Sequence, residues 1–132
     1  LPSHAKVCIG NHHIVVWNKP VCDRLIQHYK YGWNISFVYT LPSLLSDHLS
    51  PPDLYVLTYE RGVGWTKSCG SAAACVTAIA THYFPDTKNH QWKIQTPGGV
   101  LKTCLSNNVI KQTGPVTLIS TLKAHSEITE IK

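Results

Sequence analysis

The sequence contains no methionine and few charged side chains. Only 14% of its 132 residues are Asp, Glu, Lys or Arg, against roughly 25% in an ordinary soluble domain. Because 43% of the residues are hydrophobic, the chain can bury enough apolar surface to offset its ordering entropy, which excludes a disordered tail. One domain is expected at this length. The first residue is Leu, and we expect that residues before it were removed.

Long apolar runs and clustered charge are also absent. No run approaches the roughly 18 residues of a membrane-spanning helix, so a soluble protein with no membrane partner is predicted. Seven acidic against twelve basic residues give a formal charge of +5. The Lys and Arg residues are scattered singly, without a basic run or an aromatic-flanked stripe. Nucleic acid is therefore not expected as a partner.

The cysteines are five in number and not closely paired. This pattern argues against a disulfide framework and favours a reducing compartment. Cys69 and Cys75 are spaced too widely for a zinc knuckle, and Cys8 with His12 and His13 has no matching second pair. A zinc site, and with it a metal, is therefore not expected.

Short β-type apolar runs dominate the chain and predict a sheet as the main architecture. Val21–Tyr29 is instead a candidate amphipathic helix. Ser71–Phe84 carries apolar residues on every face of a helix, which predicts a central helix wrapped by sheet. Leu41–Pro52 is predicted to be a surface excursion. The eight candidate strands are Ala5–Ile9, Ile14–Trp17, Ile35–Tyr39, Leu54–Tyr59, Trp92–Gln95, Val100–Leu105, Val109–Gln112 and Val116–Leu122.

The most informative segment, Tyr59–Cys75, runs from a strand through a glycine-punctuated turn into the central helix. The first N–H groups of a helix lack intrahelical partners and lie at the positive end of its dipole, which predicts an anion site. Small residues at Gly70, Ser71 and Ala72 let a ligand approach the backbone. The same field favours a thiolate at Cys69 and thus a proton acceptor. The alternative is a small apolar residue at a helix start.

Five motifs spread over nearly the whole chain occur in the order in which one known family carries them. The first two are Gly10-Asn11-His12-His13 and Gly32-Trp33-Asn34-Ile35-Ser36-Phe37-Val38. The third, called the signature, consists of Glu60-Arg61-Gly62-Val63-Gly64 together with Thr66, Cys69-Gly70-Ser71 and Ala73. The last two are Thr96-Pro97-Gly98-Gly99 and Thr113-Gly114-Pro115. Together they resemble diaminopimelate epimerase, and the signature resembles the surroundings of the second of its two catalytic cysteines. The match covers only the family's C-terminal half.

The resemblance implies an α+β fold with a mixed, mainly antiparallel sheet curled around the central helix. Residues 1–132 would form the C-terminal one of two pseudo-symmetric domains, with the N-terminal domain as a missing partner and a homodimer as one allowed assembly. The whole protein would interconvert LL- and meso-diaminopimelate for lysine and cell-wall biosynthesis in a bacterial cytoplasm. The resemblance implies no cofactor.

In such enzymes one cysteine removes the Cα proton as a thiolate and another donates a proton from the opposite face, because thiols can serve as base or acid near neutral pH. The resemblance implies that Cys69 is one of the two, held or activated by Glu60. His13 would pair with the other cysteine. Gly70 and Ser71 would offer donors to the α-carboxylate.

The distal carboxylate and amine of the substrate would be bound by Arg61, Asn11 and Asn34, with Glu60 also at the substrate. Taken singly, Glu60 and Arg61 could be an exposed strand end, and either Asn could satisfy local backbone. His13 could equally be a satisfied core or surface histidine.

The chain also departs from the family pattern. His12 replaces a proline, Trp65 a common Glu, Ser71 a common Thr and Ala72 a common Gly. The first half's motif, Gly-Asn-Gly followed by Arg-Cys, is absent, so the isolated chain is expected not to turn over substrate. The other cysteines are expected to be buried small hydrophobes, namely Cys8, Cys22, Cys75 and Cys104.

Three alternatives stay open. The first is a racemase of another amino acid, such as histidine or proline, and the second is a non-catalytic binding or assembly half. The third is a cysteine hydrolase, which predicts Cys69 within hydrogen-bond reach of His13. The epimerase hypothesis instead predicts Glu60 as the neighbour of Cys69.

Overall fold

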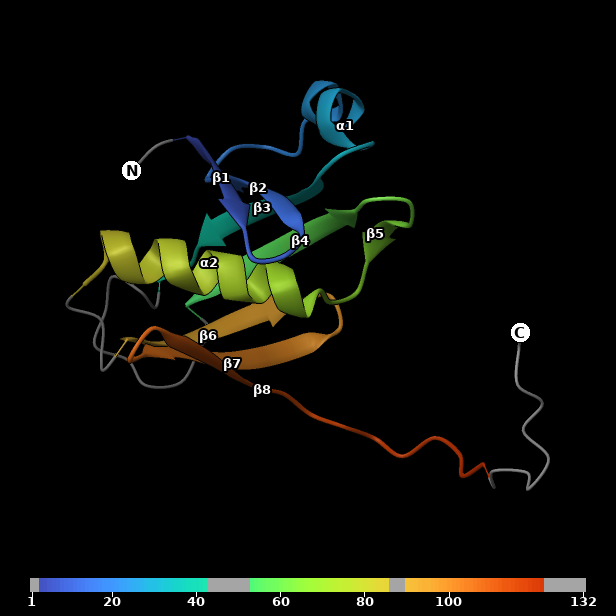
Figure 1. Ribbon diagram of the computed structural model, residues 1–132, viewed down its shortest axis with the longest axis vertical. Coiled ribbons are helices and arrows are strands. Elements are labelled where there is room, and N and C mark those ends of the chain that lie inside the picture. Colours follow the sequence, from blue (N-terminus) through green and yellow to red (C-terminus); the bar gives the residue numbers. More distant parts are fainter. Residues whose placement is uncertain (1–2, 43–52, 86–89, 123–132) are drawn as a thin grey trace.

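The computed structural model describes residues 3–42, 53–85 and 90–122 (Figure 1). Apart from Leu41 and Pro42, the predicted surface excursion lies outside the described residues. The elements, in chain order, are β1 His4–Cys8, β2 His12–Trp17, α1 Asp23–Tyr29, β3 Asn34–Thr40, β4 Leu54–Glu60, β5 Gly64–Thr66, α2 Gly70–Tyr83, β6 Gln91–Thr96, β7 Gly99–Ser106 and β8 Val109–Thr113.

The strands form one sheet in the order β1-β2-β3-β4-β6-β7-β8, with β5 paired to β4 outside this path. The β2–β3 and β4–β6 pairs are parallel, and the remaining pairs are antiparallel. Helix α2 packs against β2 and β3 and also against β7 and β8, so the sheet curls around it (Figure 1). The predicted α+β fold with a mixed, mainly antiparallel sheet is therefore confirmed.

Helix α2 forms where the sequence is rich in alanine, the best helix former, and it ends at Tyr83, two residues before Pro85. The residues from Ala72 to Thr77 are all buried, whereas Tyr83 at its end is 40% exposed. The helix is central along most of its length. Among the described residues, no helix is long and apolar enough to cross a membrane.

Two clusters of apolar side chains form the core, one on each face of the sheet. Because successive side chains of a strand point to opposite faces, Val15 and Trp17 of β2 pack with α2, while Ile14 and Val16 pack with Ile26 of α1. This explains why β2 is buried without interruption from His13 to Trp17. Strand β2 is thereby held from both sides.

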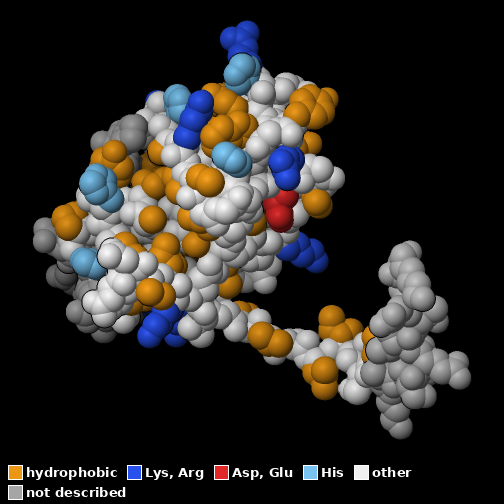
Figure 2. Space-filling model, in the orientation of Figure 1, with side chains coloured by type: hydrophobic (Ala, Val, Ile, Leu, Met, Phe, Trp, Pro, Cys, Tyr) orange, Lys and Arg blue, Asp and Glu red, His pale blue; other side chains and the backbone are white. Residues whose placement is uncertain are grey.

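One predicted strand is wrong. Val116–Leu122 has no regular structure, and its large apolar side chains are 81–96% exposed. The segment leaves the sheet after β8 (Figure 1), and its apolar side chains stand clear of the body in Figure 2. Its β-type composition is not enough, because a strand also needs a neighbour to accept its hydrogen bonds. Conversely, β5 was not predicted.

Candidate active site

Strand register brings one end each of β2, β3 and β4 together, at the same end of the sheet. His13 in β2 lies opposite Asn34 in β3, and Ile35 lies opposite Tyr59 in β4. The parallel strands β2 and β3 begin where the antiparallel β4 ends at Glu60. Residues from three of the family-like motifs are therefore neighbours.

The N-terminus of α2 supplies the second part of the site. Cys69 is the N-cap residue, in extended conformation and without a side-chain cap hydrogen bond. The first helical bond runs from the Ala73 N–H to the Cys69 carbonyl at 3.0 Å. The N–H groups of Gly70, Ser71 and Ala72 precede it and have no carbonyl of the helix to bond. Three backbone N–H groups without an intrahelical partner therefore lie at the helix start that follows Cys69.

A line of hydrogen bonds joins the two parts. Cys69 Sγ lies 3.5 Å from Ser71 Oγ. Asn11 Nδ2 donates to the same oxygen at 3.1 Å, and Asn11 Oδ1 lies 3.1 Å from His13 Nε2. Residues that the resemblance places in one site, from the β1–β2 turn, β2 and the start of α2, are brought together.

The imidazole of His13 is buried against Asn11. Because an amide oxygen only accepts, the contact with Asn11 places the ring proton on Nε2. Nδ1 is buried without a hydrogen-bond partner. Burial lowers the pKa of His13, the nearby Glu60 carboxylate opposes that shift, and His12 adds to it.

Asn34 ties the strand ends together through its amide. Its Oδ1 accepts the backbone N–H of Arg61 at 2.8 Å, and its Nδ2 donates to the His12 carbonyl at 3.5 Å. Both ends of the Asn34 amide therefore bond backbone groups that lie 22 and 27 positions away in the chain, so these are contacts between strands and not the local backbone role considered for this residue. The Arg61 residue itself is exposed.

The side chain of Cys69 is hydrogen-bonded to Ser71. Among the described residues, neither Glu60 nor His13, the two partners considered for Cys69, forms a hydrogen bond with it. Glu60 instead acts electrostatically on His13. The contact required of a hydrolase is not formed.

Two further contacts fix the loop and the helix start around Cys69. The Gly98 N–H donates to the Lys67 carbonyl at 2.7 Å, and a Cβ at Gly98 would lie 3.0 Å from that oxygen. Gln112 Nε2 donates to the Gly70 carbonyl at 2.6 Å. Sequence reasoning missed Gln112, and its one signal was its place directly before the Thr113-Gly114-Pro115 motif.

Of the four other cysteines, which were expected to be buried, only one is. Cys75 is buried, whereas Cys8 is exposed and Cys22 and Cys104 are half-buried. The prediction of four buried hydrophobes is therefore wrong except for Cys75, because the edge strand β1 and the start of α1 leave side chains near solvent. Burial raises the pKa of Cys75 to about 12, with smaller contributions from Cys69 and Cys8.

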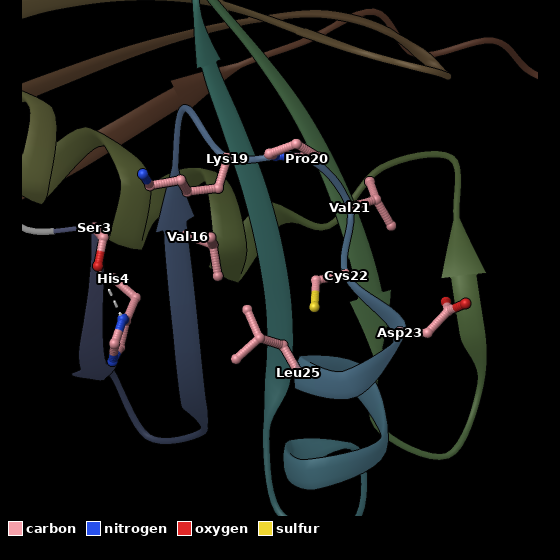
Figure 3. Close-up of a pocket in the computed structure, with 9 residues that line it drawn as sticks. All are labelled: Ser3, His4, Val16, Lys19, Pro20, Val21, Cys22, Asp23 and Leu25. Carbon is pink, nitrogen blue, oxygen red and sulfur yellow. Dashed lines mark hydrogen bonds between the residues drawn. The ribbon is translucent and has the colours of Figure 1, made fainter.

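A hollow of about 590 Å³ lies between β1, β2 and α1, away from the candidate site (Figure 3). Val16 and Leu25 face it beside Lys19 and Asp23. No residue that the sequence assigns to the active site lines it. Within residues 3–42, 53–85 and 90–122, no group of three His, Cys, Asp or Glu side chains is placed to hold a metal ion.

Comparison with solved structures defines the fold. Residues covering 76% of this chain superpose on 36% of a PhzC/PhzF phenazine biosynthesis protein from Clostridium difficile, with a TM-score of 0.57 and 13% identity. A PhzF-family phenazine biosynthesis protein from Bacillus anthracis gives a TM-score of 0.51 at 15% identity, over 78% of this chain and 34% of that one. The chain therefore has the fold of a part of these proteins.

Comparison of sequences identifies the relatives. No family model matches the chain. It is 33% identical over 114 residues to diaminopimelate epimerase from Bartonella quintana, covering 83% of this chain and 39% of the relative. It is 35% identical over 77 residues to the Acidothermus cellulolyticus enzyme, covering 57% and 25%. The predicted resemblance to diaminopimelate epimerase is confirmed, and the chain spans well under half the length of these relatives.

Proposed function

We propose that this chain provides one half of the active site of a cofactor-independent amino-acid epimerase. The observation that carries the proposal is the line of hydrogen bonds from Cys69 through Ser71 and Asn11 to His13 at the start of α2. It unites a nucleophilic sulfur, free backbone donors and a buried imidazole. The relatives named diaminopimelate epimerase support the same reaction class.

Cys69 exchanges a proton with the substrate Cα. As a thiolate it takes the Cα proton, and the electron pair of the broken C–H bond delocalises into the α-carboxylate. The N–H groups of Gly70, Ser71 and Ala72 stabilise that developing charge, because they are fixed donors that need no reorganisation. A second cysteine then protonates Cα from the other face, and in the reverse direction the two exchange roles.

The surrounding polar groups hold this arrangement. Asn11 positions the Ser71 hydroxyl, which contacts the Cys69 sulfur. His13 keeps Asn11 oriented through the contact between its Nε2 and Asn11 Oδ1. Arg61 is exposed near Glu60 and serves the distal end of the substrate, with Asn34 fixing its backbone.

The whole protein is proposed to interconvert LL- and meso-diaminopimelate in the cytoplasm for lysine and cell-wall biosynthesis. The chain is its C-terminal domain, and the N-terminal domain carries the other cysteine. Homodimers are compatible with this arrangement. The apolar side chains of Val116–Leu122 are exposed, which supports the proposal that a partner domain covers this segment. The chain alone then lacks one proton carrier and does not epimerise.

Proton exchange in D₂O tests the function. The chain is measured alone and inside a fusion in which it replaces the matching segment of the Bartonella quintana relative. Loss of the Cα–H signal of LL-diaminopimelate in NMR spectra is expected for the fusion only. Cys69→Ala in the fusion is expected to slow exchange by about a thousandfold or more. Full-rate epimerisation by the chain alone, or by the fusion carrying Cys69→Ala, would refute the proposal.

The same assay separates the alternative functions. If the fusion exchanges the Cα proton of proline or histidine faster than that of diaminopimelate, the protein is a racemase of another amino acid. No exchange of any of the three by a folded fusion indicates a non-catalytic half. Diaminopimelate is the expected substrate because its second carboxylate and amine match the polar groups around Arg61 and Glu60.

A further inference from the structure

One cross-strand pair holds α2 at two points. Thr103 of β7 and Gln112 of β8 lie opposite each other in the sheet. Thr77 Oγ1 donates to Thr103 Oγ1 at 2.6 Å, and Gln112 Nε2 donates to the Gly70 carbonyl at 2.6 Å. Gly70 and Thr77 are about two helical turns apart, so they share one face of α2. The pair therefore contacts the middle and the start of the same helix face.

The two contacts have different consequences. The Thr77–Thr103 bond is buried and anchors the middle of α2 to the sheet. With that anchor alone, the first turn could still tilt or fray, as helix ends do. The Gln112 bond is exposed to solvent, but it acts on the first helical residue, which is where such fraying begins. It therefore restrains the peptide group that carries the Ser71 N–H, two residues after Cys69.

The bond from Gln112 also acts through the peptide unit. The Gly70 carbonyl and the Ser71 N–H belong to the same peptide group. A donor on the carbonyl polarises the group and strengthens its N–H as a donor, since linked hydrogen bonds reinforce one another. The Ser71 N–H is one of the donors that face the candidate anion position. Gln112 thus strengthens a donor that it does not touch.

We propose that Gln112 is a positioning residue for the thiol and anion site at the start of α2. It acts through Gly70, and it contacts neither Cys69 nor the reacting atoms. The inference rests on the proposed function in taking Cys69 and the first amides of α2 as the reacting site. Its test reads the reactivity of the thiol itself and needs no epimerase activity.

The test is alkylation by iodoacetamide at pH 7.5, followed at each cysteine by peptide mass spectrometry. Gln112→Met keeps the size of the side chain and removes the donor. Because the thiolate is the reacting form, a loosened helix start is expected to slow alkylation of Cys69 by about three- to tenfold, the worth of one hydrogen bond. Exposed Cys8 in the same molecules is the internal reference. Lys111→Met, one residue away in β8, is the matched control and is expected to leave Cys69 unchanged.

If Gln112 has a purely structural role, its replacement is expected to speed cysteine alkylation and not to slow it. Destabilisation would open the core and speed the alkylation of buried Cys75, whereas a positioning role slows Cys69 and leaves Cys75 protected. Gln112→Glu, which has the same length but places an acceptor against the Gly70 carbonyl, is expected to slow Cys69 at least as much as Met. Unchanged or faster alkylation of Cys69 in both variants overturns the proposal. A fusion that fails to exchange Cα protons while this alkylation pattern holds would refute the epimerase function but not the role of Gln112.

Discussion

Asn11 donates a hydrogen bond to Ser71 Oγ at 3.1 Å, although the two residues lie sixty positions apart in the chain. The contact joins the turn between β1 and β2 to the first turn of α2. The same Asn11 amide accepts from His13 Nε2, so one side chain links the beginning of β2 to the start of α2. The candidate site depends on this link.

A double-mutant cycle measures the link. Asn11→Ala, Ser71→Ala and the double variant are compared by urea unfolding. Removing a hydrogen bond of this kind is expected to give a coupling energy of about 0.5–1.5 kcal/mol, toward the lower end because Asn11 is exposed and Ser71 is half-buried. A coupling energy indistinguishable from zero would show that the two side chains do not stabilise each other.

The pH dependence of stability reports the buried imidazole. Burial lowers the pKa of His13 in the folded chain, so below the unfolded value of about 6.5 the unfolded state binds more protons. The free energy of unfolding therefore falls as the pH drops through that value, by at most about 1.4 kcal/mol per pH unit for this group. Urea unfolding at pH 7.5 and 5.5 measures the fall.

Variants assign that pH dependence to His13. His13→Gln is expected to reduce the loss of stability between the two pH values, because glutamine does not titrate. The chain has eight histidines, so His4→Gln, at an exposed position, provides the control and should keep the loss. Equal pH dependence in both variants would contradict the burial of a neutral His13.

Cys75 is expected to resist alkylation in the folded chain. Burial raises its pKa to about 12, so almost no thiolate forms at pH 8, and iodoacetamide also lacks access. Mass spectrometry should find modified Cys75 only after urea unfolding, while exposed Cys8 reacts without denaturant. Equal modification of the two cysteines under native conditions would disprove this assignment.

Gly98 allows the close approach of two backbones beside Cys69. A Cβ there would lie 3.0 Å from the Lys67 carbonyl oxygen, so Gly98→Ala is expected to destabilise the fold by about 1–3 kcal/mol through overpacking. Gly32→Ala is the matched control, since a Cβ at Gly32 meets nothing within 4 Å. Urea midpoints compare the two, and a Gly98→Ala protein as stable as the control would exclude the steric explanation.

Local patterns were sufficient for most of the secondary structure. The alanine-rich run predicts Ser71–Phe84, and the helix spans Gly70–Tyr83. Strands such as Leu54–Glu60 follow their alternating burial. Strand β5, Gly64–Thr66, is too short to show an alternating pattern. Val116–Leu122 has the composition of a strand, but no neighbouring strand pairs with it in the described part of the chain.

The sequence by itself determined the motifs, the central helix and the cysteine at its start, because these depend on residue type, spacing and helix-end chemistry. Only the tertiary structure decided which groups meet. It placed Glu60 near His13, bonded Cys69 to Ser71, joined Asn11 to Ser71 and brought Gln112 to Gly70. Such contacts follow from strand register and from the curl of the sheet around α2, which depend on the packing of the whole chain.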